Sequence, residues 1–280
     1  MLIMKDRGMR IDDPDFCFSV LQQVNYYRLM AFTLTYKKND GSDKYIDGTS
    51  FTDIFDLYQF DYKLRHMLVG VLEGIEIAFR TKIAYYFGHT YGSLGYTKSE
   101  YSSNEEHHLK MLDELKKAIE SNQEVFVEHH LTKYGGQFPV WVAVELLSFG
   151  VVSKFYANML IEDKKAITSK YYNTTTDYLS TWIRTAVHLR NTSAHYGRLY
   201  NKFLKVTPKL HNRFKNKLEN KLLFTGLFVL RELAPSQKEW LSFVTNLEAL
   251  IEEYSHVVDL AVMGFPDDWE SYLRDNKYCK

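Results

Sequence analysis

Seven side chains that can bind anions or transfer protons recur at helical spacing between residues 184 and 205. Successive members lie four or three residues apart: Arg184, His188, Asn191, His195, Arg198, Lys202 and Lys205. Since an α-helix turns once in 3.6 residues, this spacing places all seven within one arc of about 100°. The opposite arc carries Trp182, Ala186, Leu189, Tyr196, Tyr200, Phe203 and Leu204, which we expect to be buried. A helix from Tyr178 toward Val206, limited by Pro208, would therefore present a row of cations, imidazoles and one amide to a partner.

His195 lies in the middle of this row and has the side chain best suited to proton transfer, because the ordinary pKa of imidazole, about 6.5, is close to neutral pH. Asn191 lies one turn before it and Arg198 one turn after it, so a hydrogen-bonding group and a permanent cation are within reach. Cleavage of an RNA phosphodiester needs a base for the 2′-OH proton, an acid for the leaving 5′-oxygen and a guanidinium for the charge that builds on the phosphate. That scheme requires no metal and no cofactor. The alternative is that His195 is structural, as lone histidines on helices more often are.

The charge of the chain is balanced overall but not locally. Its 35 basic residues face 35 acidic ones, which gives a net charge of zero. Between Tyr178 and Leu222, ten basic residues accompany a single acidic residue, Glu219, so this segment carries +9. Such a segment attracts polyanions over a Debye length of about 8 to 10 Å, and a phosphate backbone is the obvious candidate. The alternative is a solvated face that binds nothing.

The rest of the chain predicts an all-α protein that can position this row. It has five prolines and 14 glycines in 280 residues and no strand-like alternation of comparable strength. Apolar residues at spacings of three, four or seven predict a long helix from Thr52 to about Phe87, and a nearly all-apolar segment from Pro139 to Leu160 predicts a central one. We expect a helical segment over residues 1–50, a helical core over 51–210 that carries the row, and a C-terminal helical extension over 211–280 packed on the core.

Composition also limits the setting in which the protein works. The sequence has two cysteines, Cys17 and Cys279, at opposite ends and each without a neighbouring cysteine, which leaves no CxxC pair, no zinc ribbon and no disulfide framework. No stretch approaches the roughly 20 apolar residues that span a bilayer. We expect a cytoplasmic protein with no membrane association, no metal and no cofactor. The adjacent pairs His107-His108 and His129-His130 lack further ligands at metal spacing and are expected at the surface.

Three carboxylates and one arginine outside the row are candidates to support it. Glu73, Glu76 and Arg80 fall at spacings of three and four on the long helix, so Glu76 and Arg80 can pair. A carboxylate here would orient Arg190 or His195; the alternative is a structural pair worth about 0.3 to 0.5 kcal/mol if exposed. Glu145 stands in an otherwise apolar segment, and we expect it to be buried against a cation.

The segment Arg190-Asn191-Thr192-Ser193-Ala194-His195 resembles the R-x4-6-H motif of HEPN ribonucleases. The longer stretch LRNTSAHYGRLYNK resembles the motif of the Abi-like (AbiD/AbiF) abortive-infection proteins of bacteria. Three more stretches resemble segments of that family in the same order: NYYRLMAFTLTY, FTDIFDLYQFDYKLRHMLVGVLEGIEIAFRTKIAYYFG and PVWVAVELLSFGVVSKFY. The resemblance covers roughly Asp15 to Lys205.

This resemblance implies a HEPN-like helical bundle that forms a homodimer, joins two copies of the motif in one cleft and cuts RNA without a metal in defence against phage. It places the catalytic roles on Arg190, Asn191 and His195. On an ideal helix Arg190 lies about 140° from His195. Either the two residues act from different protomers, or the helix distorts near Thr192 and Ser193; the sequence leaves both open.

Two other functions fit the basic segment. One is a non-catalytic RNA-binding protein that holds a structured regulatory RNA, with an affinity that falls steeply with salt. The other is a helical interaction module that docks its basic helix on an acidic protein surface. Nucleotide-dependent and zinc-protease chemistry have no support, since the sequence contains no P-loop, GxGxxG or HExxH motif.

Overall fold

The protein is built from helices packed around one very long helix. The computed structural model describes residues 1–275, and within them there are short 3-10 turns and isolated bridges but no β-strand, so the predicted all-α class is confirmed. The α-helices are α1 Leu2–Asp6, α2 Pro14–Gln23, α3 Tyr26–Met30, α4 Phe51–Tyr91, α5 Glu105–Ser121, α6 Val125–Lys133, α7 Val140–Leu146, α8 Phe149–Asn158, α9 Ile161–Tyr172, α10 Thr176–Ala194, α11 Asn212–Lys215, α12 Leu223–Leu233, α13 Gln237–Glu253 and α14 Trp269–Arg274. Cys279 lies outside the described residues, and Cys17 is a buried free thiol.

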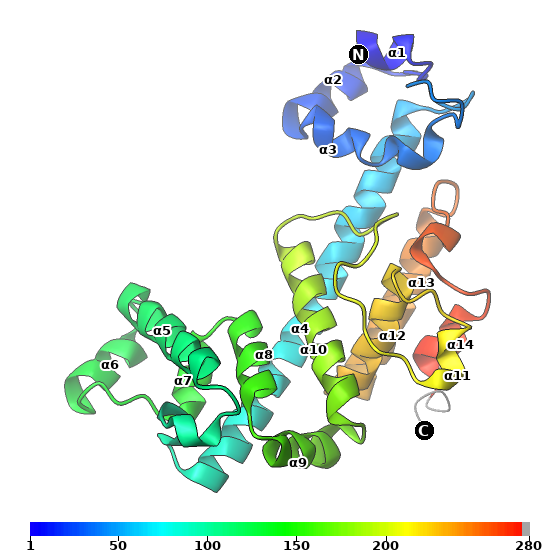
Figure 1. The fold of residues 1–280 in the computed structure, drawn as a ribbon. Coiled ribbons are helices and arrows are strands. Elements are labelled where there is room, and N and C mark those ends of the chain that lie inside the picture. Colours follow the sequence, from blue (N-terminus) through cyan, green and yellow to red (C-terminus); the bar gives the residue numbers. More distant parts are fainter. Residues whose placement is uncertain (276–280) are drawn as a thin grey trace.

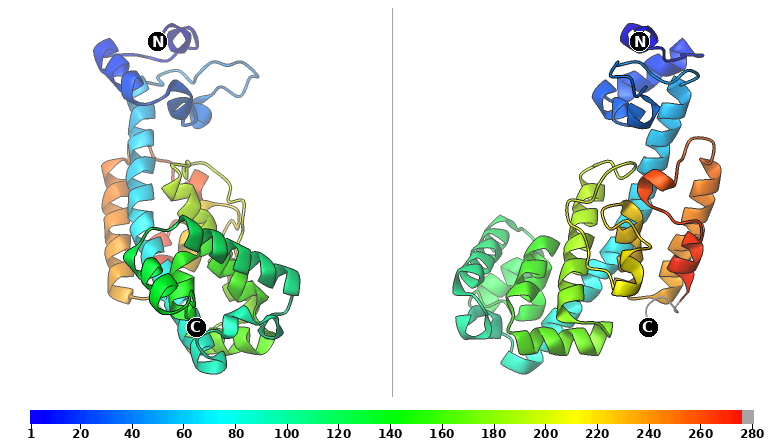
Figure 2. Two further views of the ribbon diagram at one scale, coloured as in Figure 1. Left: turned by 90° about the vertical axis from the view of Figure 1, so that its left-hand side faces the viewer. Right: turned by 45° about the vertical axis from the view of Figure 1, so that its right-hand side comes forward.

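Helix α4 is the axis of the molecule and, with 41 residues, is about 60 Å long. It begins at a capping box in which Ser50 and Asp53 each bond the other's backbone N–H, and it ends before Gly92. The helices α1 to α3 lie around its N-terminal end, and α5 to α8 lie near its other end (Figures 1 and 2). The spacing of its apolar residues explains this position, because they form a buried stripe along the whole helix.

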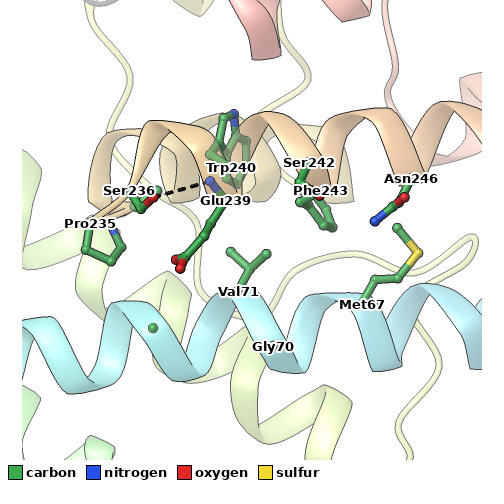
Figure 3. Close-up of a pocket in the computed structure, with 12 residues that line it drawn as sticks. Met67, Gly70, Val71, Pro235, Ser236, Glu239, Trp240, Ser242, Phe243 and Asn246 are labelled. Atoms are coloured by element: carbon green, nitrogen blue, oxygen red, sulfur yellow. Dashed lines mark hydrogen bonds between the residues drawn. The ribbon is translucent and has the colours of Figure 1, made fainter.

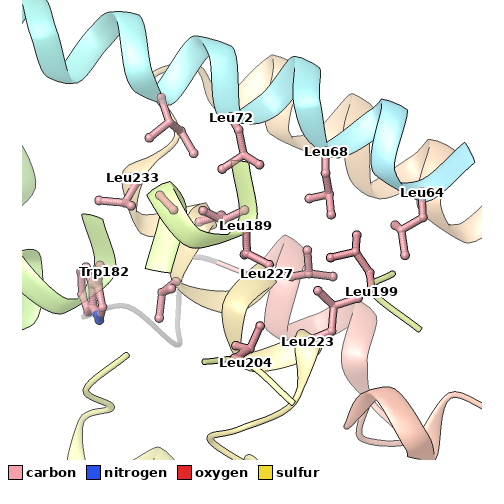
Figure 4. Packing of buried hydrophobic residues seen from close by; sticks show 14 of the residues in the cluster. Leu64, Leu68, Leu72, Trp182, Leu189, Leu199, Leu204, Leu223, Leu227 and Leu233 are labelled. Atoms are coloured by element: carbon pink, nitrogen blue, oxygen red, sulfur yellow. The ribbon is translucent and has the colours of Figure 1, made fainter. Parts of the chain in front are cut away.

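Helix α10 runs antiparallel to α4 through the centre of the protein (Figure 1). In the shared core, Leu64, Leu68 and Leu72 of α4 point toward leucines that follow or belong to α10 and α12, among them Leu189, Leu199 and Leu227 (Figure 4). All six are at most 4% exposed. Truncating one such leucine to alanine costs about 2 to 5 kcal/mol, so this packing fixes α10 firmly on α4.

Helix α13 packs along another side of α4, where a small pocket of about 270 Å³ remains between them (Figure 3). Gly70 and Gly74 contribute to this pocket because they have no side chain; a Cβ on Gly74 would lie 3.8 Å from Pro235 Cγ, and one on Gly70 would meet nothing within 4 Å. Helix α4 is continuous through both glycines.

Two predicted helices end earlier than expected. The apolar segment from Pro139 is divided into α7 and α8, because Leu147 adopts an extended conformation and Ser148 caps α8 by accepting a hydrogen bond from Val151 N. The helix predicted to run toward Val206 ends at Ala194. Of the helices in residues 1–275, none is both long and apolar enough to cross a bilayer.

Candidate functional site

The end of α10 explains why the predicted row of seven residues does not form. Gly197 N donates to Thr192 O at 2.7 Å and Tyr196 N donates to Ser193 O at 3.3 Å, which is the hydrogen-bond pattern of a Schellman cap. His195 is the cap residue, and Tyr196 occupies the left-handed position with φ of 58°. Glycine usually takes that position, and here glycine comes one residue later. Because a tyrosine takes this position, the sequence did not predict that the helix ends here.

The chain after His195 leaves the direction of the helix, so the seven predicted residues form two groups and not one row. Arg184, His188 and Asn191 lie on α10, and His195 lies at its end, whereas Arg198, Lys202 and Lys205 lie on the irregular segment that follows. Two residues expected on the buried arc are exposed for the same reason, Tyr196 at 67% and Phe203 at 68%. The other five of that arc are buried.

Arg190 is held by a buried carboxylate of α4. Its Nε lies 3.3 Å from Glu76 Oε2, while the other oxygen of Glu76 accepts from Arg80. The Glu76 side chain is 11% exposed and that of Arg190 is 37% exposed. Arg190 Nη1 also lies 3.3 Å from Asn191 Oδ1, so its guanidinium has a fixed direction and still reaches solvent. A carboxylate on this helix was expected to orient either Arg190 or His195, and Glu76 contacts Arg190 and not His195.

Arg80 anchors the Glu76 carboxylate but, because it is buried, does not compete with Arg190 for a ligand of the site. It is buried, and its Nη1 donates to the carbonyls of Val144 and Leu147 at the end of α7. Those carbonyls have no helical partner, so Arg80 satisfies them while it balances Glu76. Together Glu76, Arg80 and Arg190 carry one negative and two positive charges, and the uncompensated charge is on the partly exposed Arg190.

The other two predicted supporting carboxylates are not part of this arrangement. Glu73 and Glu145 are both exposed, and neither forms an ion pair within residues 1–275. The expectation of a buried Glu145 was wrong because α7 is only partly covered by its neighbours and Glu145 lies on the uncovered side.

A second buried ion pair, which sequence reasoning missed, fixes the segment after the motif. Asp61 is fully buried on α4 and pairs with Arg65 one turn later. Its Oδ1 also accepts from the backbone N–H groups of Leu199 and Tyr200 at 2.7 Å each. Burial raises the pKa of Asp61, while Arg65 and the two N–H groups act in the opposite direction. The available signal was an Asp and an Arg within the apolar stripe of α4, where charges are rare.

His195, the predicted proton-transfer residue, is exposed at the end of α10. Within the described part of the chain, its imidazole has no hydrogen-bond or ion-pair partner. The ring is therefore free to meet a ligand, and Asn191, four residues earlier, is exposed on the same side of the helix.

His188 has a structural contact that differs from its predicted anion-binding role. Its Nε2 accepts a hydrogen bond from Lys205 N at 3.3 Å, which requires a neutral ring. Burial, Lys202 and Lys205 all lower the pKa of His188 and so favour the same neutral form. His188 thus ties the irregular segment back to α10.

The remaining predicted anion-binding residues separate into two places. Arg184 and Lys205 are exposed and Lys202 is half-exposed, and within residues 1–275 none of the three has a carboxylate partner. Arg198 instead points toward the N-terminal helices, where its Nη1 donates to Ala31 O at 2.5 Å and its guanidinium lies over Phe32.

The histidine pairs form no metal site in the described residues, where no group of three or more His, Cys, Asp or Glu side chains is placed to hold a metal ion. Three of the four are at least partly exposed, as expected, but His108 is buried. Its Nε2 lies 2.9 Å from Tyr96 O, so it links α5 to the turn after α4.

Fold and site together define an all-α protein that presents a histidine and a carboxylate-held arginine near the end of one central helix. A family model for Abi-like protein matches residues 19–201, well over half of the chain. The chain therefore belongs to the Abi-like protein family. No curated protein and no solved structure matches it. The matched span includes α4, α10 and the segment held by Asp61, and so contains Glu76, Arg190, Asn191 and His195, whereas Lys202 and Lys205 lie just beyond it.

Proposed function

We propose that this protein is a metal-independent endoribonuclease of the HEPN type that acts in the cytoplasm of bacteria in abortive-infection defence against phage. Membership of the Abi-like family supports the defence role. The observation that carries the catalytic assignment is the arrangement at the end of α10: an exposed imidazole on His195, and an arginine, Arg190, held in place by Glu76.

Each group has a role in 2′-OH attack on the adjacent phosphate. His195 takes the 2′-OH proton as the oxygen attacks phosphorus, and an imidazolium returns a proton to the leaving 5′-oxygen. Arg190 binds the nonbridging oxygens, where charge increases in the transition state. Asn191 assists by orienting Arg190, whose Nη1 lies 3.3 Å from Asn191 Oδ1. The products are a 2′,3′-cyclic phosphate and a free 5′-OH.

Each chain supplies one imidazole, that of His195, to the proposed site, and this favours a homodimer because the reaction uses a base and an acid at the same time. Two chains joined at the ends of their α10 helices would supply two copies of His195 to one phosphate. Helix α10 stays regular through Ala194, and His195 N donates to Asn191 O at 3.0 Å, so Arg190 and His195 of one chain point in different directions. This favours Arg190 of one protomer acting with His195 of the other.

The test is cleavage of RNA by the purified full chain in EDTA, with the product ends identified. We expect 2′,3′-cyclic phosphate ends, no cleavage where the 2′-OH is replaced by hydrogen, and loss of cleavage in His195→Ala and Arg190→Ala proteins that keep their helix content. Undiminished cleavage by both variants would rule out the assignment.

A second function is favoured by cations that have no carboxylate partner among residues 1–275. Arg184, Lys202 and Lys205 would serve equally in a protein that holds a structured RNA without cutting it. Tight, salt-sensitive binding with no cleavage of any RNA pool would identify that function. Recovery of an acidic protein and no nucleic acid would identify the interaction module instead.

A further inference from the structure

A groove between the N-terminal helices and the end of α10 has a composition that the proposed catalysis does not explain. It has a volume of about 540 Å³, within the range of sites that hold small molecules. Among the described residues, its charged lining consists of Arg28, Arg65 and Arg198, with no acidic side chain, and its aromatic lining includes Tyr27, Phe32 and Tyr196. We call it the tyrosine–arginine groove. Its segments come from α3, the N-terminal half of α4 and the cap of α10, which lie near one another (Figures 1 and 2).

A buried carboxylate, Asp61, lies near two of the three arginines. Asp61 pairs with Arg65 and also attracts Arg198, but within residues 1–275 neither Arg28 nor Arg198 has a carboxylate within ion-pair distance. Arg28 and Arg198 each use one N–H donor in a hydrogen bond to a backbone carbonyl. Arg28 Nη1 donates to Tyr196 O at 2.8 Å, and Arg198 Nη1 donates to Ala31 O at 2.5 Å. A guanidinium has five N–H donors, so each retains donors for an anion. The groove therefore holds two net positive charges and favours a phosphate.

The aromatic residues of the groove are exposed to an unusual degree. Tyr27 is 82% exposed and Tyr196 is 67% exposed, and within residues 1–275 neither side chain forms a hydrogen bond. Exposed tyrosine rings beside arginines are a stacking surface for unpaired bases, which is how proteins bind single-stranded nucleic acid without reading its sequence.

The backbone of Tyr196 adds an independent reason to assign its ring a function. A left-handed conformation costs an L-residue with a Cβ about 1 to 2 kcal/mol, and glycine would avoid that cost at the same helix cap. The ring of Tyr196 is mostly in solvent, so its burial contributes little to the stability of the fold. A strained residue of this kind indicates that its side chain, and not the stability of the fold, decides which amino acid stands there.

We propose that the tyrosine–arginine groove binds single-stranded RNA, with bases stacked on Tyr27 and Tyr196 and a phosphate held by Arg28 and Arg198. The inference rests on the proposed RNA-cleaving function, because His195 directly precedes Tyr196 and the strand that passes His195 would continue into the groove. It gives the N-terminal helices, to which the sequence assigned no role, the task of selecting unpaired RNA.

The test measures the affinity of the full-length His195→Ala protein for a fluorescent single-stranded RNA of about ten nucleotides. Adding Tyr27→Ala should weaken binding about 5- to 150-fold, which is the stacking energy of one base expressed as an affinity ratio. The matched control is Tyr85→Ala, since Tyr85 is an exposed tyrosine on α4 that does not line the groove. It should leave the affinity within about twofold.

Arg28→Gln tests the phosphate contact in the same assay, with Lys116→Gln on α5 as a control that removes an equal charge far from the groove in the fold. Arg28→Gln should weaken binding and reduce its salt dependence by about one phosphate contact. Tyr27 is the second, independent variant because Arg28 also holds the cap of α10. The proposal is overturned if Tyr27→Ala and Tyr85→Ala bind alike, if duplex RNA binds more tightly than single-stranded RNA, or if poly-glutamate binds as tightly as RNA.

The outcomes separate this proposal from the nuclease assignment. RNA cleavage that is lost in His195→Ala, together with an affinity that does not change in Tyr27→Ala, would refute the groove and keep the nuclease. Affinity that depends on Tyr27 in a protein whose wild type cuts no RNA would refute the nuclease and keep the groove.

Discussion

Glu76→Gln is the substitution that most sharply tests how α4 supports the site. Glu76 contacts a buried arginine, Arg80, and a partly exposed one, Arg190. Removing one partner of a buried ion pair costs about 3 to 5 kcal/mol, whereas a pair as exposed as that with Arg190 is worth at most about 1 kcal/mol. Arg80 keeps two carbonyl acceptors, and glutamine keeps one oxygen as an acceptor. We therefore expect Glu76→Gln to lower the free energy of unfolding by about 2 to 3 kcal/mol.

The effect on cleavage should be separate from this loss of stability. Without the carboxylate, the Arg190 guanidinium loses its fixed direction, and a displacement of about 1 Å at a reacting group costs about 100-fold in rate. The charge that Arg190 meets develops in the transition state, so kcat should fall about 10- to 100-fold while KM changes little. The assay is steady-state RNA cleavage at a temperature where urea denaturation shows the variant fully folded.

Glu73→Gln is the matched control, because Glu73 is an exposed carboxylate on the same helix. It should change stability by less than about 0.5 kcal/mol and leave kcat unchanged. A Glu76→Gln protein that is destabilised as expected but cleaves RNA at the wild-type rate would show that Glu76 is purely structural, and would refute the argument that Arg190 needs orientation.

Three further predictions follow from the backbone and from protonation. Gly74→Ala should raise the free energy of unfolding by about 0.8 to 1 kcal/mol in urea denaturation. Gly226→Ala should raise it less or lower it, because the added Cβ would lie 3.0 Å from a buried leucine carbon of α10. Equal gains in the two variants would contradict this packing. Tyr196→Gly should raise the free energy of unfolding by about 0.5 to 1 kcal/mol, because the relief of the left-handed conformation exceeds the entropy cost of glycine. The same change should weaken RNA binding. A loss of stability would refute the strain argument. Because the pKa of His188 is lowered on folding, the folded chain binds fewer protons there, so this contribution to stability is complete above about pH 6.5 and is lost as the pH falls below it. His188→Gln keeps an acceptor for Lys205 N but cannot titrate, and an acid loss of stability identical to that of wild type would contradict the assignment.

The long helices could be predicted because many residues agree on them. In α4 and α10 the apolar residues repeat at helical spacing over several turns, and packing then follows the pattern. The pairing of Glu76 with Arg80 was accessible for the same reason, as both lie one turn apart on one helix. Its extension to Arg190 was only one of two alternatives, since nothing in the sequence fixes the register of α10 against α4.

What could not be predicted depends on single residues or on contacts distant in sequence. The end of α10 depends on Tyr196 in a conformation that sequence rules reserve for glycine. Asp61 meets Leu199 and Tyr200 across more than 130 residues, and no local pattern reports such a contact. Because the segment after His195 is irregular, helical periodicity placed Arg198 in a row of cations when it belongs to the tyrosine–arginine groove.

The central claim, that the imidazole of His195 transfers protons during RNA cleavage, is tested most directly by the cleavage rate of His195→Ala in EDTA. His107→Ala is the matched control, since His107 is an exposed histidine on α5. The account predicts a loss of about 10²- to 10⁴-fold for His195→Ala and none for His107→Ala, with both proteins folded. A His195→Ala protein that cleaves RNA within about twofold of the wild-type rate would contradict it.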